Sequence, residues 1–255
     1  MVHKTMTQYY KSEDDYLKDF KANEFDQVLF SIDPVIFTIK DKKLHVLMVQ
    51  RNSFPFKHAW ALPGGRIDKQ KSENIEDAVR LKLLAKTGLD HAYFEQVLTD
   101  GGKTMDPRGW SLTTVYLALV RYEDVQLTKN ETGESVAWQA VDKLETLPLI
   151  AFWHHKLIHA SLTRLRDKIT YTDLPANLMP EVFTIRQLRM AYEAILDIEI
   201  TRQAFVKRAN QLIDKGLLVD TGDMSDEVGR PAKLFKYRPE EKPHVFSHAM
   251  TKVNN

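Results

Sequence analysis

The chain has 255 residues, of which 43% are hydrophobic and 28% are charged, and its formal net charge at pH 7 is +1. This composition is typical of a folded globular protein, and the length suits two modest domains. We expect no membrane span, because no stretch approaches ~20 apolar residues, and we expect no secretory signal at the N-terminus. The absence of cysteine excludes disulfides, thiolate catalysis and cysteine-ligated zinc, and it favours a cytoplasmic location. With so little net charge, any surface that binds nucleic acid must be a local basic patch.

The first predicted strands follow a polar leader, which we assign to residues 1–24. Phe30–Ile39 is rich in β-branched and aromatic residues, and Leu44–Val49 has apolar residues at alternate positions. Both patterns are typical of strands. The residues between them, 41–43, are Asp-Lys-Lys and predict a turn.

Further strands are predicted at Tyr93–Leu98, Leu112–Val120 and Val136–Trp138, with a loop from Asp100 to Trp110 between the first two. One helix interrupts the strands, because apolar residues recur at helical spacing across Glu73–Lys86. Strands mixed with one long helix favour an α+β or α/β sandwich over an all-helical fold.

A glycine turn precedes this helix in the segment Ala59-Trp60-Ala61-Leu62-Pro63-Gly64-Gly65-Arg66. Gly64 and Gly65 have no Cβ, so the backbone can adopt positive φ and approach a ligand closely. Gly88 stands where the helix is expected to end in a left-handed cap.

This stretch resembles the Nudix box, the signature of a family of hydrolases. When the signature is anchored on Gly88 and Leu89, Glu73 takes the first glutamate position, and an insertion of two residues follows Gly65. Residues without a carboxylate hold the remaining charged positions of the signature: Leu81, Lys82, Ala85 and Lys86.

Nudix hydrolysis needs Mg²⁺ or Mn²⁺ held by clustered carboxylates, since hard cations take oxygen ligands. The box therefore predicts binding without catalysis, with no catalytic residue, no metal site and no cofactor. The remaining acids Glu73, Glu76 and Asp77 lie at the start of the helix, where they complement its dipole. An active ADP-ribose hydrolase with metals held by Glu73, Glu76, Glu131 or Glu134 is the alternative. His155 and His159 lie four apart on a predicted helix, but without a carboxylate in register they do not predict a metal site.

The C-terminal part has the element order of a winged helix-turn-helix. Leu149–Ile169 is predicted to be a helix that connects two modules, and its many apolar residues make it a candidate for part of a dimer interface. Thr184 to Gln187 is a capping box that opens a second helix, and Thr201–Lys215 is a third, capped by Thr201. Leu217–Val219 is expected to pair with Lys233–Tyr237 as a β-hairpin.

The outward face of the helix at 201–215 and the hairpin after it are basic. Arginine and glutamine reach base edges, whereas lysine mostly contacts phosphate. The alternative is that these basic residues only form a solvated helix face. Their position on the second helix after a short turn, followed by a basic hairpin, favours DNA binding. The predicted DNA-binding residues are Thr201, Arg202, Gln203, Lys207, Arg208, Arg230 and Lys233.

A Nudix-like domain followed by a winged helix resembles the Nudix-related transcriptional regulators of NAD metabolism, the NrtR family, from about Phe30 to Arg238. The resemblance depends on six motifs in this order: Leu62-Pro63-Gly64-Gly65, Thr87-Gly88-Leu89, Asp106-Pro107-Arg108-Gly109, Arg164-Leu165-Arg166, Tyr192-Glu193-Ala194-Ile195-Leu196 and Gly229-Arg230-Pro231-Ala232. It implies an α+β chain, with a Nudix-type α/β/α sandwich followed by a winged helix-turn-helix. We divide it into a Nudix-like domain (1–147), a connecting helix (148–170), a DNA-binding domain (171–240) and a flexible tail (241–255).

The resemblance also implies a homodimeric repressor of NAD-metabolism genes that binds a two-fold symmetric operator and is released by ADP-ribose. A diphosphate needs cationic and N–H donors, and adenine or ribose needs aromatic or apolar walls. Asp106 could accept ribose hydroxyls or start the Asp-Pro turn. The predicted effector-binding residues are Arg51, Lys57, Trp60, Gly64, Gly65, Arg66, Asp106, Arg108 and Trp110. A regulator of the same fold that responds to a sugar is a further alternative.

Overall fold

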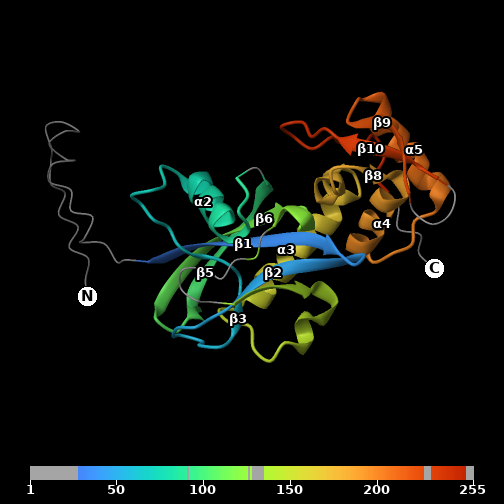
Figure 1. Ribbon diagram of the computed structural model, residues 1–255. Coiled ribbons are helices and arrows are strands. Elements are labelled where there is room, and N and C mark those ends of the chain that lie inside the picture. The colour runs from blue at the N-terminus through green and yellow to red at the C-terminus, as the bar shows by residue number, and fades with distance from the viewer. Residues whose placement is uncertain (1–27, 91, 126, 128–134, 227–230, 251–255) are drawn as a thin grey trace, which may run out of the picture.

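The computed structural model describes residues 28–90, 92–125, 127, 135–226 and 231–250, so the polar leader lies outside the described residues. The chain forms a mixed sheet with helices on both faces, followed by a smaller unit of two helices and a three-stranded sheet (Figure 1). Within the described residues, no helix is both long and apolar enough to cross a membrane.

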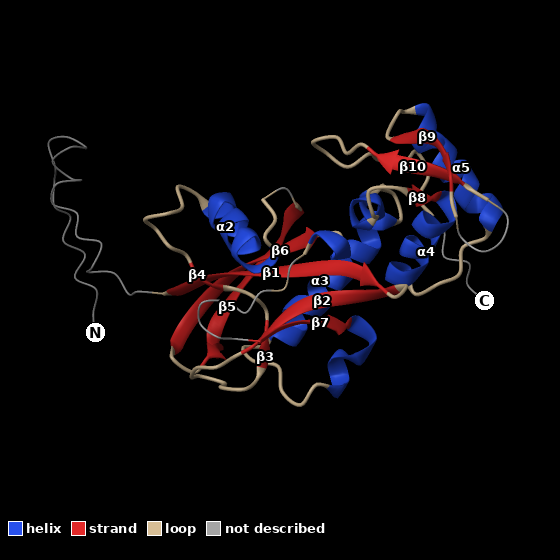
Figure 2. Cartoon of the chain, in the orientation of Figure 1, coloured by secondary structure: helices blue, strands red, loops and turns tan. Residues whose placement is uncertain are grey.

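The larger sheet has seven strands (Figure 2). They are β1 (Leu29–Lys40), β2 (Lys43–Gln50), β3 (Trp60–Ala61), β4 (Gly65–Arg66), β5 (Tyr93–Asp106), β6 (Gly109–Leu119) and β7 (Ser135–Ala140). The order along the sheet is β3-β2-β1-β6-β5, with β4 paired to β1 and β7 to β2. The central strands β1 and β6 run parallel, whereas the other pairs are antiparallel.

Two helices cover the two faces of this sheet: α2 (Ile75–Thr87) and α3 (His154–Ile169). Ile32 and Ile36 of β1 pack in the cluster that contains the buried residues of α2. Val35 and Phe37 of the same strand pack with α3. Alternate side chains of a strand point to opposite faces, so a strand covered on both faces is apolar along its length. This arrangement confirms the expected sandwich.

The smaller unit contains β8 (Phe183–Thr184), α4 (Ile185–Leu196), α5 (Arg202–Asp214), β9 (Leu218–Met224) and β10 (Lys233–Tyr237). Short 3₁₀ helices lie at Tyr122–Asp124, Val141–Thr146 and Leu174–Leu178. The predicted capping box is confirmed, because the Thr184 side chain accepts from Gln187 N–H and the Gln187 side chain accepts from Thr184 N–H. Helix, helix and hairpin follow one another as in a winged helix.

Two boundary predictions were wrong. The segment from Asp100 is not a loop, because β5 continues to Asp106 and pairs with β6, with a shift in register between Gly102 and Asp106 and a tight turn between the two strands. The helix predicted from Leu149 begins at His154, because Phe152 and Trp153 have positive φ (54° and 64°) and cannot continue a right-handed helix. Most apolar residues of α3 are buried within the chain, whereas Leu149 and Trp153 before it are 50% and 38% exposed.

The described part of the C-terminal tail is packed rather than flexible. Phe246 is buried, its N–H donates to Tyr171 O, and Met250 N–H donates to Thr170 O. The prediction of a flexible tail fails here because Phe246 packs against α5 and the residues after α3.

Candidate functional site

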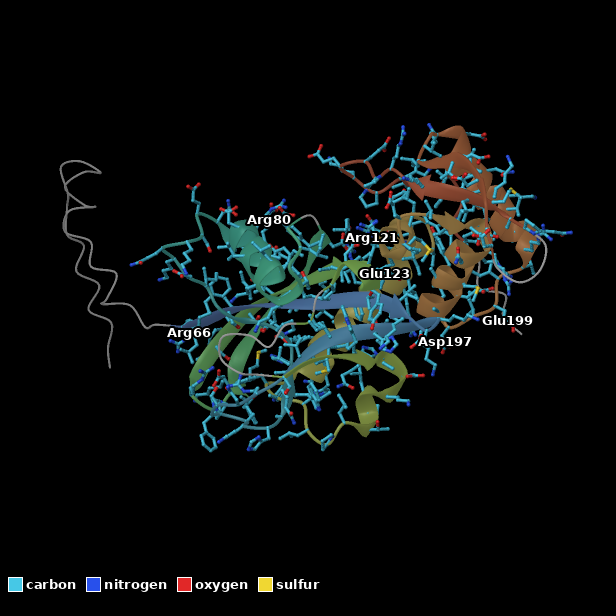
Figure 3. All side chains as sticks on the ribbon, viewed as in Figure 1. Arg66, Arg80, Arg121, Glu123, Asp197 and Glu199 are labelled. Atoms are coloured by element: carbon cyan, nitrogen blue, oxygen red, sulfur yellow. The ribbon has the colours of Figure 1, made fainter. Side chains whose placement is uncertain are left out.

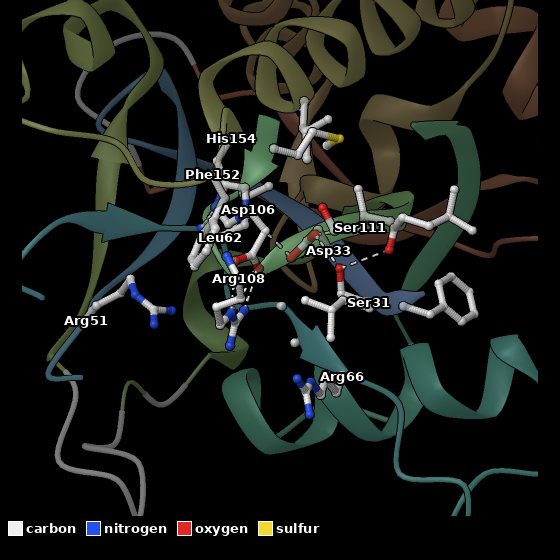
Figure 4. Close-up of a pocket in the computed structure, with 18 residues that line it drawn as sticks. Ser31, Asp33, Arg51, Leu62, Arg66, Asp106, Arg108, Ser111, Phe152 and His154 are labelled. Atoms are coloured by element: carbon white, nitrogen blue, oxygen red, sulfur yellow. Dashed lines mark hydrogen bonds and ion pairs between the residues drawn. The ribbon is translucent and has the colours of Figure 1, made fainter. Parts of the chain in front are cut away.

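A pocket opens where the start of β1, the glycine turn, the β5–β6 turn and the start of α3 converge (Figure 4). Six of the nine predicted effector-binding residues line it: Arg51, Gly64, Gly65, Arg66, Asp106 and Arg108. These six residues come from three segments of the chain, and the whole lining comes from five. Figure 3 shows Arg66 at the end of the sheet remote from the winged helix, whereas Arg121 and Glu123 lie where the two units meet.

Two arginines form a cationic wall around one aromatic ring. The guanidinium of Arg51 lies 4.8 Å from the ring centroid of Phe152, and that of Arg108 lies 5.7 Å from it. Arg108 also donates to Asp106, with Nη2 2.6 Å from Oδ2 and Nε 2.9 Å from Oδ1. Burial alone would raise the pKa of Asp106, but the hydrogen bonds and charge of Arg108 outweigh it and hold the pKa below its usual range. Asp106 is thus an orienting anion that fixes one arginine.

The base of the pocket contains a buried carboxylate and a buried imidazole. Asp33 accepts from Thr113 Oγ1 at 2.6 Å, and its Oδ1 lies 3.8 Å from His154 Nε2. His154 Nδ1 accepts from Leu62 N–H at 2.8 Å, which requires this nitrogen to be unprotonated. Burial lowers the pKa of His154, and the charge of Arg51 adds to this while Asp33 opposes it. The imidazole is therefore neutral and carries its proton on Nε2, facing Asp33.

The glycine turn fits closely over this base. A Cβ on Gly64 would lie 1.7 Å from Asp33 Oδ1, so no side chain can stand there. Gly65 has a φ of 143°, which favours glycine. The residue types alone predict that glycine allows close approach to a ligand, whereas here Gly64 is required by the Asp33 carboxylate of β1.

The acidic residues of α2 lie at its N-terminal end. Asn74 caps α2 by accepting from Asp77 N–H at 2.9 Å, and Glu76 and Asp77 lie in the first turn. They are placed to complement the helix dipole. No group of three or more metal-ligating side chains occurs in the described part of the chain, and Glu131 and Glu134 lie outside it.

Three predicted effector residues are not brought to the pocket wall. Trp60 lies in β3 and packs against the main core cluster, which favours the structural role over ligand contact. Lys57 lies 6.0 Å from the Phe54 ring centroid in the loop before β3. Trp110 is 48% exposed at the start of β6, next to the pocket residue Ser111. Sequence reasoning missed Asp33, Phe152 and His154, which no local motif marks.

In the smaller unit, α5 presents a polar face to solvent. Gln203 and Lys207 are exposed as predicted, and Asn210 joins them one turn further along. Val206 is 38% exposed between them. Arg202 lines a groove with Arg186 of α4 and Lys233 of the hairpin, although Lys233 also pairs with Asp220 at 2.7 Å. Thr201 caps α5 by accepting from Ala204 N–H, and Arg230 lies outside the described residues.

The structure contradicts the prediction that Arg208 contacts DNA. Its side chain is buried, with only 7% of the residue exposed. The guanidinium donates to Ile169 O at 3.1 Å, Thr170 O at 2.5 Å and His248 O at 3.4 Å, and it lies 4.0 Å from the Phe246 ring centroid. Arg208 therefore joins α5 to the end of α3 and to the tail, and it has no donor face toward solvent.

Comparisons with known proteins agree with both parts of this architecture. The NUDIX domain family matches residues 31–161, and the NrtR DNA-binding winged helix domain family matches residues 175–237. Over 230 residues the chain is 35% identical to the ADPR responsive transcriptional repressor NtrR of Acinetobacter baylyi, covering 89% of each protein. The chain belongs to the NrtR family.

Two solved structures of Shewanella oneidensis NrtR are similar to this member of the family. The crystal structure of that protein with a 27mer DNA shares 36% identity and a TM-score of 0.80, over 88% of this chain and 100% of the other. The cocrystal structure of its NUDIX domain with ADP ribose shares 38% identity and a TM-score of 0.56, over 60% of this chain and 99% of the other. The predicted NrtR fold, a Nudix domain followed by a winged helix, is confirmed.

Proposed function

We propose that this protein is a transcriptional repressor whose winged helix binds operator DNA and whose Nudix domain binds ADP-ribose. Binding of ADP-ribose causes the protein to release the DNA. The observation that carries the proposal is the arginine-rich pocket in the same chain as a winged helix. The similarity to an ADPR responsive repressor extends over both units. A protein of this function acts in the cytoplasm and needs no cofactor beyond its effector.

The chemistry of the pocket suits a nucleoside diphosphate sugar. Arg51 and Arg108 can donate N–H groups to phosphate oxygens in the bidentate geometry that guanidinium favours. Arg66 adds a third cation at the glycine turn. Phe152 offers an apolar ring, and Asp33 is a buried acceptor suited to a hydroxyl group.

The proposal includes binding without hydrolysis. Lys82 and Lys86 hold positions where the resemblance to the Nudix box requires carboxylates. An ammonium group repels a divalent cation, and without a metal no bound water is activated as a nucleophile. The competing function, an active ADP-ribose hydrolase with a DNA-binding domain, needs acids that these lysines replace.

A DNA titration with and without saturating ADP-ribose, at one fixed salt concentration, tests the central claim. The apparent Kd for operator DNA should rise by about 5- to 150-fold, the usual range of coupling between two sites. Arg51→Ala and Arg108→Ala should bind DNA like the wild type and lose the response, because they line the pocket and lie outside the DNA-binding unit. Unchanged DNA affinity together with no heat of ADP-ribose binding would instead favour the sugar-responsive alternative.

Catalytic silence needs a separate measurement. Purified protein incubated with ADP-ribose and Mg²⁺ or Mn²⁺ should release no more AMP than a buffer blank. The release of AMP is measured by chromatography. Steady release of AMP that disappears in Glu73→Gln or Glu76→Gln would restore the hydrolase interpretation.

A further inference from the structure

One lysine of α2 reaches back to the glycine turn at the edge of the pocket. Lys82 Nζ donates to Arg66 O at 2.9 Å. It also lies 3.6 Å from the position that a Cβ on Gly65 would occupy. Gly65 and Arg66 both line the pocket, so the Lys82 ammonium lies against backbone that forms part of its wall.

The space in front of Gly65 is otherwise open. Among the described residues, Lys82 Nζ is the one heavy atom found within 4 Å of the added Cβ, apart from atoms of the adjoining residues. An ammonium has three N–H donors, and the hydrogen bond to Arg66 O takes one of them. An anion that enters the pocket over Gly65 would therefore meet a cationic donor.

The position of Lys82 is chemically informative. By the resemblance to the Nudix box, this residue stands where a metal-binding glutamate is expected. Mg²⁺ in such sites is held by one or two carboxylates together with phosphates of the ligand, so its charge faces the diphosphate. Leu81, Lys82, Ala85 and Lys86 supply no carboxylate, and the donor set does not fit a divalent cation.

We propose that the Lys82 ammonium replaces that cation and binds the diphosphate of ADP-ribose directly, so that effector binding needs no metal. The inference depends on the proposed effector site and adds the residue that compensates for the lost glutamates. A lysine ammonium neutralises phosphate charge as a compact point charge, but unlike a metal it activates no water. The same substitution would thus preserve binding and remove hydrolysis.

The electrostatics around Lys82 agree with this role. Burial lowers its pKa, Asp33 opposes this by favouring the charged form, and Lys86 lowers the pKa further. A lysine in these surroundings gains stabilisation of its charge when an anion arrives. A diphosphate would supply that stabilisation.

The first measurement is calorimetry of ADP-ribose binding to the wild-type full chain, in EDTA and in Mg²⁺. The affinities should agree within about 2-fold, well below the factor of ten that corresponds to ~1.4 kcal/mol. Binding that is lost in EDTA would overturn the inference while leaving an ADP-ribose-responsive repressor intact. Absence of binding in both buffers would count against the proposed function itself.

The second measurement compares Lys82→Gln with Lys71→Gln. Glutamine retains an N–H donor for Arg66 O and removes the charge, so it separates the charge from the structural hydrogen bond. Lys82→Gln should weaken ADP-ribose binding by about 10-fold or more, as expected for loss of a charge-assisted contact. Lys71→Gln removes an exposed lysine from the loop before α2, where its ammonium lies 3.6 Å from the Asp68 carboxylate. This variant should bind ADP-ribose like the wild type.

Operator binding without ADP-ribose serves as the test of folding, since Lys82 lies in the Nudix domain. Lys82→Gln should bind DNA like the wild type and need about 10-fold more ADP-ribose for release, in line with its weaker binding. A variant that binds DNA and also responds at the wild-type ADP-ribose concentration would overturn the role of Lys82. Should Lys82→Gln not fold, the metal dependence of the wild type still decides the question.

Discussion

At the base of the ligand pocket, His154 is held neutral by its surroundings. Its Nδ1 accepts from Leu62 N–H, and the ring is buried beside Asp33. Protonation of Nδ1 would break that hydrogen bond and place a second cation close to Arg51. The N-terminus of α3 is therefore joined to the glycine turn through a group that must remain uncharged.

This arrangement predicts a specific dependence of stability on pH. Because burial lowers the folded pKa of His154 below its ordinary value of 6.5, the unfolded chain binds the proton more readily. The contribution of His154 is fully present above about pH 6.5 and is lost as the pH falls below it, by at most ~1.4 kcal/mol per pH unit.

Denaturant unfolding at pH 7.5, 6.5 and 5.5 measures this effect. His154→Asn keeps an acceptor for Leu62 N–H but cannot be protonated at Nδ1, so its stability should fall less than that of the wild type between pH 6.5 and 5.5. The exposed His159→Asn is the control and should follow the wild type. Parallel curves for the wild type and His154→Asn would show that His154 does not titrate on unfolding.

The arginines of the ligand pocket could be predicted from the sequence, but the buried residues at its base could not. Arg51 and Arg108 could be predicted because cations near a glycine turn suit a diphosphate. Asp33 and His154 could not, since they lie 121 residues apart along the chain and only the sheet and α3 bring them together. Arg208 shows the opposite error: it lies three residues after Phe205 and four before Leu212, both buried, so helical periodicity already placed it inward. The position of Arg208 on the helix, rather than its charge, decides where the side chain lies.

Among the elements, α5 makes the clearest prediction, because its solvent face and its buried face are distinct. Gln203→Ala and Asn210→Ala should each relax sequence preference at one base pair and weaken operator binding by ~1–3 kcal/mol, if each amide reads an adenine. Lys207→Ala should weaken operator and random DNA alike and flatten the salt dependence.

Gln211→Ala supplies a matched control for this helix. Gln211 is exposed on α5 one turn after Lys207, and both line a hollow beside the C-terminal tail, so this control keeps the surroundings and leaves the charge of Lys207 in place. It should bind operator DNA like the wild type in a fluorescence titration. Equal binding by all four variants would exclude α5 as the recognition helix.

The prediction of elements succeeded where local rules dominate. The capping box at Thr184 and the glycine cap at Gly88 mark helix ends through hydrogen bonds within a few residues. It failed at the start of α3, where Ala151 N–H donates to Trp60 O and holds the chain beside β3. That contact is long-range, so the apolar pattern after Leu149 could not disclose it.

For the whole molecule, we predict a dimer on a two-fold symmetric operator. One winged helix reads few base pairs, and paired half-sites about one helical turn apart, or a multiple of it, are the usual solution. Insertion of about five base pairs between half-sites would turn one of them to the opposite face of the DNA and should weaken binding strongly, whereas about ten should weaken it less. Light scattering of the free protein and of the complex measures the oligomeric state, and a monomer in both would exclude the prediction.

The position of Arg208 limits how this protein can exchange parts with its relatives. The guanidinium on α5 is satisfied by carbonyls at the end of α3 and in the tail, which lie outside the winged-helix match at 175–237. A chimera that carries only those residues, without a segment equivalent to the end of α3 and the tail, would bury a cation without its acceptors, which is strongly destabilising. A transplanted winged helix therefore needs backbone carbonyls in the places that the end of α3 and the C-terminal tail provide here.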